Sequence, residues 1–175
     1  MKDVLRRVGV FAAGLCAVVA MTSGSAVAAE SGADDMASIA GWGKIYEWTP
    51  GHASNKRLDL ATKVNKANVW NDNNGSNQSW RTYSYGNNLF AFQNMANRQC
   101  LRYNGTGVQM TTIPCDNSDS YKFRGVKSGG WWTFRPLNNN GVCIDVKGRG
   151  TANGTHVVTW HCNGDSNQRW KLSEV

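Results

Sequence analysis

The chain has 175 residues, with 19 Lys and Arg against 12 Asp and Glu and a formal net charge of +7 at pH 7. This length is typical of one domain and excludes a large multidomain enzyme. Five Cys, eight Trp and 19 Gly, with 18% charged residues, exclude a disordered, collagen-like or coiled-coil chain. The basic residues are dispersed and form no run of five or six, which argues against a nucleic-acid partner.

Residues 1–28 have the features of a cleaved secretory signal peptide. Three basic residues precede an apolar run over residues 8–20, and an Ala-Val-Ala sequence ending at Ala28 supplies small residues for a signal peptidase. The run is shorter than the ~20 residues of a membrane-spanning helix. We therefore expect a secreted, extracellular protein without a membrane span, with a flexible leader over residues 29–40.

Three copies of one pattern follow at a period of about 43 residues. Asp59, Arg102 and Asp145 each lie between two apolar or aromatic residues, and they are 43 residues apart. A Gln-x-Trp motif lies near the end of the first and third copies, and the middle copy has a degraded version of it. The predicted copies cover about residues 41–85, 86–128 and 129–175.

The four cysteines outside the predicted signal peptide follow the same register. An even number in an exported chain implies a disulfide framework, and four cysteines allow three connectivities. Cys100 and Cys143 come before the first motif of their copies, whereas Cys115 and Cys162 come before the Gln-x-Trp position. The register therefore favours the bridges Cys100–Cys115 and Cys143–Cys162, one within each copy.

The first copy has Arg57 and Asp72 at the two cysteine positions. We expect these residues to lie side by side and to form a salt bridge. An exposed ion pair contributes ~0–1 kcal/mol, against roughly 3 kcal/mol for a disulfide that closes a loop of about 15 residues. We therefore expect the first copy to be held more loosely than the others.

Local patterns indicate short β-strands. Aromatic-rich segments such as 89–92 and 131–134 lie between Gly- and Asn-rich turns, and no amphipathic helix of useful length is found. Many short strands in three equivalent units favour a closed all-β structure. Trp80, Phe123 and Trp170 recur once per copy and are expected in the core.

Three Gln-x-Trp repeats with intra-repeat disulfides resemble the ricin B-type β-trefoil lectin domain, found in plant toxin B-chains and secreted bacterial carbohydrate-binding modules. The resemblance covers about residues 41–175. It implies an all-β fold, a β-trefoil of three pseudo-equivalent repeats in a single domain. It also implies a carbohydrate ligand and no cofactor.

Within this resemblance, the third copy has the residues of a sugar-binding site. A sugar requires an apolar surface for its C–H face and oriented groups for its hydroxyls. Asp145 is an acceptor, Trp160 a stacking platform, and Asn167 both donor and acceptor, while Gln168 can hold Asp145 in place. His161, beside the platform, is a candidate for an additional contact.

The first copy has Asp59, Trp70, Asn77 and Gln78 at the corresponding places. The stretch from Arg57 to Asp72 is four residues shorter than its counterpart in the third copy, so this site is expected to be altered or shallow.

The middle copy lacks the set, with Arg102 for Asp, Ile113 for Trp and Ser120-Tyr121 for Asn-Gln. We interpret it as a scaffold repeat without a sugar site of this type.

Catalysis has little support in the sequence. A glycosidase needs two carboxyl groups roughly 5–10 Å apart, and Asp59 and Asp145 belong to different lobes. The sequence has no Gly-x-Ser-x-Gly nucleophile elbow, and His52, His156 and His161 lack the spacing of zinc ligands.

The sequence therefore predicts a secreted, non-catalytic lectin, and the resemblance implies galactose-type sugars or a plant or cell-surface polysaccharide as its ligand. The alternative is a lectin-like receptor-binding subunit of a multi-component bacterial toxin, resembling cytolethal distending toxins, with toxin partner subunits. A third option, a β-trefoil protease inhibitor, lacks a distinctive inhibitory loop.

Overall fold

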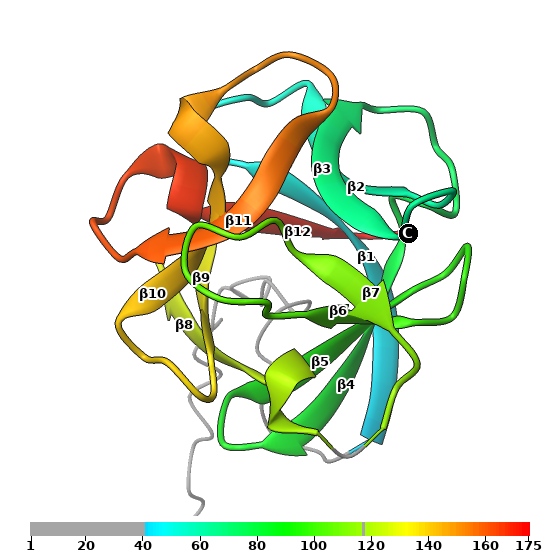
Figure 1. The fold of residues 1–175 in the computed structure, drawn as a ribbon, viewed down its shortest axis with the longest axis vertical. Helices are drawn as coiled ribbons and strands as arrows, with labels where there is room; N and C mark the ends of the chain where they lie inside the picture. Colours follow the sequence, from blue (N-terminus) through cyan, green and yellow to red (C-terminus); the bar gives the residue numbers. More distant parts are fainter. Residues whose placement is uncertain (1–40, 117) are drawn as a thin grey trace, which may run out of the picture.

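The computed structural model describes residues 41–116 and 118–175, which form twelve β-strands and three short 3-10 helices (Figure 1). The strands are β1 (Gly41–Pro50), β2 (Lys56–Ala61), β3 (Lys66–Asn71), β4 (Trp80–Gly86), β5 (Leu89–Asn94), β6 (Cys100–Arg102), β7 (Thr111–Ile113), β8 (Phe123–Ser128), β9 (Trp131–Pro136), β10 (Val142–Val146), β11 (Thr155–His161) and β12 (Trp170–Glu174). The 3-10 helices are η2 (Asp119–Tyr121), η3 (Lys147–Arg149) and η4 (Ser166–Gln168). The predicted signal peptide and leader lie outside the described residues. Within those residues, no helix has the length and apolar character needed to span a membrane.

Six strands form a closed barrel. Antiparallel pairs join β1 to β4, β4 to β5, β5 to β8, β8 to β9, β9 to β12, and β12 back to β1. Because the ring closes, none of these six strands is left as an open sheet edge.

The other six strands form three hairpins, β2–β3, β6–β7 and β10–β11. Strand β3 also pairs with β7 and with β11, so the hairpins are joined to one another as well as to the barrel (Figure 1). Each consecutive set of four strands thus supplies two barrel strands and one hairpin. The architecture is a β-trefoil of three repeats, which confirms the predicted fold.

Aromatic side chains fill the barrel. Trp80, Phe123 and Trp170 are fully buried, as the sequence predicts. Trp80 donates its indole N–H to the Leu58 carbonyl at 3.0 Å, and Trp170 makes the equivalent bond to Ile144 at 3.2 Å. Phenylalanine in the second repeat has no N–H and fills the position by packing alone. In the first and third repeats, the Trp of the Gln-x-Trp motif therefore joins a hairpin strand to the core through this hydrogen bond.

Strand alternation separates the adjacent residues Trp131 and Trp132. Trp132 is buried and stacks on Phe134 with ring centroids 5.6 Å apart, whereas Trp131 is half-buried. Trp48, on β1, lies at the centre of the core, 4.7 Å from the Phe134 ring. Only Trp132 of the two adjacent tryptophans therefore faces the core.

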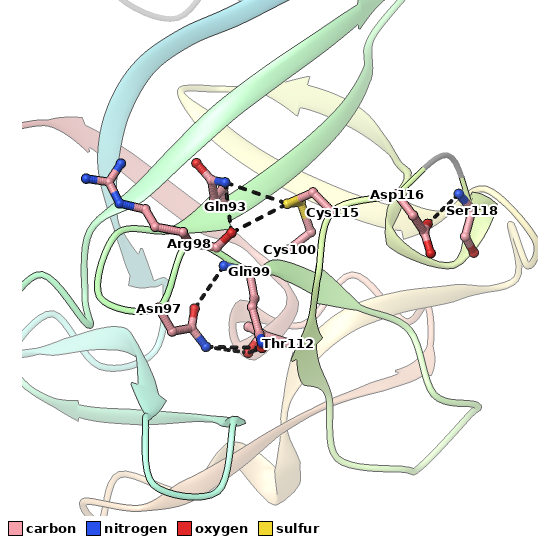
Figure 2. The surroundings of a disulfide bond; sticks show 9 residues. All are labelled: Gln93, Asn97, Arg98, Gln99, Cys100, Thr112, Cys115, Asp116 and Ser118. Atoms are coloured by element: carbon pink, nitrogen blue, oxygen red, sulfur yellow. Dashed lines mark hydrogen bonds between the residues drawn. A yellow bond between two sulfur atoms is a disulfide. The ribbon is translucent and has the colours of Figure 1, made fainter.

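Both predicted disulfides are present, Cys100–Cys115 and Cys143–Cys162, with Cα atoms 5.1 Å apart in each. Each bridge ties the first strand of a hairpin to the segment that follows its second strand. Figure 2 shows the Cys100–Cys115 bridge, where the Gln93 side chain donates to the Cys115 sulfur at 3.8 Å.

Arg57 and Asp72 form the predicted salt bridge, with Arg57 Nη2 2.8 Å from Asp72 Oδ2. Arg57 also donates its Nε to Glu47, at 3.1 Å on the neighbouring strand β1. The side chains of Arg57 and Glu47 are only 19% and 11% exposed. The first repeat therefore has a partly buried triad of charges at this position, a stronger tie than the exposed pair that the sequence suggests.

Candidate functional site

The third repeat brings its four predicted site residues together. Asp145 lies on β10 and is 3% exposed, while Trp160 lies on the paired strand β11 and is 49% exposed. Asn167 and Gln168 are on η4, where the chain turns back toward the barrel. A buried carboxylate thus lies beside an exposed indole ring.

Two amides hold the Asp145 carboxylate. Asn167 Nδ2 and Gln168 Nε2 each donate to Asp145 Oδ2 at 2.8 Å. Gln168 also donates to the His161 carbonyl at 2.9 Å and accepts the Asn163 N–H at 2.9 Å. Since both amide bonds within the described residues end on Oδ2, the other oxygen, Oδ1, is left to accept from a ligand.

The site has an unusual electrostatic environment. Burial raises the pKa of the Asp145 carboxyl above its usual 3.8, and the bonds from Gln168 and Asn167 and the nearby His52 oppose that rise. The Oδ1 atom of Asn167 is buried without a partner among the described residues. The fold therefore keeps a desolvated carboxylate and an unsatisfied amide oxygen in one place, an arrangement that costs stability and is typical of binding sites.

A pocket of about 460 Å³ opens onto these groups. Its lining includes Asp145, Trp160 and Asn167, together with the η3 segment. The second repeat contributes Gly107 to the lining: it has φ +77°, and a Cβ atom there would lie 3.1 Å from the Trp160 ring. The site is thus built between two repeats.

The first repeat has the same network. Asn77 Nδ2 and Gln78 Nε2 donate to Asp59 Oδ2 at 2.7 and 3.0 Å, and burial raises the pKa of Asp59. Gln78 accepts the Asn73 N–H at 2.9 Å, as its counterpart does in the third repeat. Trp70 is 42% exposed beside this network.

The pocket of the first repeat is smaller, about 330 Å³. The β2–β3 connection spans residues 62–65, whereas the β10–β11 connection spans residues 147–154 and includes η3. The shorter connection provides less wall for a ligand. The Trp70 ring of this site lies next to Gly154 of the third repeat, where a Cβ atom would be 3.7 Å from the ring.

The middle repeat has no such network among its described residues. Arg102, at the position of the aspartates, is exposed. Tyr121, at the position of the glutamines, is buried against the Cys100–Cys115 bridge. Ile113 replaces the exposed tryptophan and packs on the same small cluster.

His161, predicted as an additional contact, lies beside the platform on β11. Its ring makes an edge contact with Trp160 at a centroid distance of 5.8 Å, and its carbonyl accepts from Gln168. The residues that line the pocket do not include it. These contacts join His161 to the platform and to Gln168, and its contact with a sugar stays a prediction.

Sequence reasoning missed two kinds of site residue. Asn73 and Asn163 fix the two glutamines, and the signal was present because each lies five residues before its glutamine. It also missed Lys147, Arg149 and Asp165, which line the third-repeat pocket. These belong to segments without a repeat signature.

The fold is a β-trefoil in which two of the three repeats have the same network of an aspartate and two amides beside an exposed tryptophan. The family model of the ricin-type beta-trefoil lectin domain matches residues 89–175. This match, with the trefoil architecture, confirms the resemblance to the ricin B-type β-trefoil lectin domain.

Solved structures share the fold. The designed threefold-symmetric protein ThreeFoil is 20% identical, covers 75% of this chain and 99% of its own, and has a TM-score of 0.71. A ricin B-like lectin of Macrolepiota procera, solved with lactose, is 17% identical over 76% of this chain and 96% of its own, with a TM-score of 0.67. A mosquitocidal holotoxin is 20% identical over 75% of this chain but only 17% of its own, with a TM-score of 0.69. No curated protein matches the chain.

Proposed function

We propose that the protein is a secreted, non-catalytic carbohydrate-binding protein whose third repeat, and also its first, binds sugar. The observation that carries this proposal is the duplicated network, in which an aspartate held by an Asn and a Gln lies beside an exposed tryptophan. An indole face can stack on the C–H face of a sugar ring, and the carboxylate can accept from neighbouring hydroxyls.

Galactose-type sugars or a plant or cell-surface polysaccharide are the proposed ligands. The Macrolepiota procera lectin was solved with lactose, and this supports a galactose-type sugar for a protein of the same fold. Two open sites on one molecule favour a ligand with repeated sugar units, because a second contact strengthens binding without new chemistry. The two disulfides support an extracellular location.

The third-repeat pocket contains a second carboxylate, that of Asp165, in addition to Asp145. Although glycosidases use two carboxyl groups, this second one is compatible with a non-catalytic sugar-binding site. It is exposed and accepts from Asn163 Nδ2 at 3.2 Å. The corresponding position in the first repeat is Gly75, so the shared network works with one carboxylate in each repeat. Sugar binding explains why both repeats have this network, whereas a catalytic pair of carboxylates would be present only in the third repeat. We expect the protein to leave 4-nitrophenyl galactosides and xylan intact.

The toxin-subunit alternative has one supporting observation, the shared fold with the mosquitocidal holotoxin. At 20% identity, this similarity concerns the fold alone. It adds a test: a receptor-binding subunit would associate with a partner chain encoded nearby, and co-expression followed by size-exclusion chromatography would detect the complex.

The test of the proposed function is binding of the mature, oxidised protein to a panel of glycans and insoluble polysaccharides. Trp160→Ala and Trp70→Ala are run in parallel. The matched control is Arg102→Ala, because Arg102 is the exposed middle-repeat counterpart of the aspartates. We expect a sugar-specific signal that falls most in Trp160→Ala, less in Trp70→Ala and not in the control. A folded protein that binds none of the glycans would contradict the proposal.

A further inference from the structure

A third pocket, the barrel pocket, has a volume of about 210 Å³ and shares no lining residue with the two pockets described above. Strands β1, β4 and β5 and the Cys100–Cys115 bridge surround it. Its lining comprises Trp42, Tyr83, Tyr85, Ala91, Cys100, Cys115, Asp116 and Tyr121.

Strand register explains why the pocket forms. Trp42 on β1 is opposite Tyr83 on β4, and Tyr83 is opposite Ala91 on β5. Tyr83 and Tyr85 alternate with buried residues along β4 and therefore lie on the outer face of the barrel. The small side chain of Ala91 leaves a hollow between the large rings, and Tyr121 is buried against it.

The rings are arranged as walls. Trp42 and Tyr83 meet edge to face, with centroids 5.1 Å apart and planes at 80°. Tyr83 and Tyr85 are 4.7 Å apart and inclined by 58°. Trp42 is 43% exposed, so part of a large indole ring is open to a ligand.

Polar groups lie within the same hollow. Burial raises the pKa of Tyr85, and its hydrogen bond with Tyr121 and the nearby Tyr83 and Asp116 raise it further. The Tyr85 phenol therefore stays neutral and can both donate and accept. Asp116, which Figure 2 shows next to the disulfide, accepts the Ser118 N–H at 2.6 Å through Oδ1.

We propose that the barrel pocket is an additional carbohydrate subsite that accepts a neutral sugar ring. The chemistry matches a sugar: an exposed indole for the C–H face, and phenol hydroxyls with a carboxylate for the sugar hydroxyls. This proposal deepens the proposed function, because it gives the protein a contact with its saccharide ligand outside the Gln-x-Trp sites.

A cationic ligand fits the pocket less well. Arg81 already lies over the Trp42 ring at 5.7 Å, and Lys122 lies over the Tyr85 ring at 5.3 Å. The protein's own cations thus occupy cation–π positions on two of the rings. A further cation would meet their positive charges, whereas a neutral sugar would not.

The eight tryptophans allow each site to be observed separately. The indole N–H signals of 15N-labelled protein are assigned by single Trp→Phe substitutions and followed during titration with lactose, xylohexaose and choline chloride. The proteins are the wild type and the double variant Asp59→Asn/Asp145→Asn, in which both Gln-x-Trp sites are disabled. Ala91→Leu fills the hollow without removing a polar group, and Tyr85→Phe removes one hydroxyl from a pocket of unchanged shape.

The expected result is a shift of the Trp42 signal with lactose or xylohexaose in the wild type and in the double variant. Ala91→Leu should abolish this shift, and Tyr85→Phe should weaken the underlying binding about fivefold through loss of one hydrogen bond. Two results would overturn the proposal while leaving the proposed function intact. In the first, sugar shifts the signal of Trp160 or Trp70 but not that of Trp42. In the second, the Trp42 signal responds only to choline, while the Trp160 signal responds to sugar. Silence of all three signals toward both sugars would overturn this proposal and the proposed function together.

Discussion

Replacing Asp145 by Asn removes the charge of the third-repeat site and keeps its size. The two amide donors on Oδ2, 2.8 Å away, can still donate to the amide oxygen of the new side chain. An NH2 group then takes the place of Oδ1, so a sugar hydroxyl loses its bond to a charged acceptor, which contributes ~1.5–3 kcal/mol. The dissociation constant measured by titration calorimetry should rise roughly 10- to 150-fold.

The same substitution should not reduce stability. Burial raises the folded-state pKa of Asp145 above 3.8. The stability linked to its protonation is therefore present below pH 3.8 and is lost as the pH rises through the folded pKa. At pH 7 the charged form is the less favourable one, so Asp145→Asn should melt at the same temperature as the wild type or higher.

The control for Asp145→Asn is Asp165→Asn, which makes the same charge change at the pocket rim. It should cause a smaller loss of affinity and leave the melting temperature unchanged. If Asp145→Asn lowered the melting temperature and bound sugar normally, Asp145 would be a structural residue and the reasoning would be refuted.

The remaining predictions concern pH, the repeat ties and the platform. Sugar binding by the wild type should weaken as the pH falls through the raised pKa of Asp145, whereas binding by Asp145→Asn should be insensitive to pH over the same range. Calorimetry at several pH values checks this prediction. A parallel decline in the affinity of both proteins would contradict it. Joint replacement of Cys143 and Cys162 by Ala should lower the free energy of unfolding by about 3 kcal/mol in urea titrations. Arg57→Met breaks the triad with Glu47 and Asp72, and it should lower the same free energy by ~1–3 kcal/mol. A larger loss of stability in Arg57→Met than in the double cysteine variant would contradict the expectation that the disulfide stabilises its repeat more than the charged triad does. Gly107→Ala should lower the free energy of unfolding by ~1–2 kcal/mol because of its positive φ, and it should weaken sugar binding by displacing Trp160. The control is Gly164→Ala, also at positive φ but with open space around it, which should lower stability without affecting the Trp160 ring. An unchanged affinity in Gly107→Ala would contradict the role of the second repeat in the site.

The sequence predicts the features that depend on register. Asp59 and Asp145 are equivalent because each lies at the same step of the period, and the network around each is the same in the structure. The disulfide pairing and the Arg57–Asp72 bridge follow from the same alignment. A repeat restricts local geometry so strongly that positions in register occupy the same places.

Contacts between elements that the repeat pattern does not align escape this reasoning. Glu47 joins the Arg57 triad because β1 lies beside β2, and Gly107 covers Trp160 because a loop of the second repeat packs on the third. Neither contact leaves a signal in the repeat pattern. The barrel pocket is a further case, since Trp42, Tyr83 and Ala91 meet through the pairing of three strands.

A crystal structure of the mature protein with the saccharide that binds most strongly in the glycan panel tests the central claim most directly. The account predicts a sugar ring stacked on Trp160, with a hydroxyl hydrogen-bonded to Asp145 Oδ1 and the amides of Asn167 and Gln168 still on Oδ2. A saccharide bound with the third-repeat and first-repeat pockets both empty would contradict it.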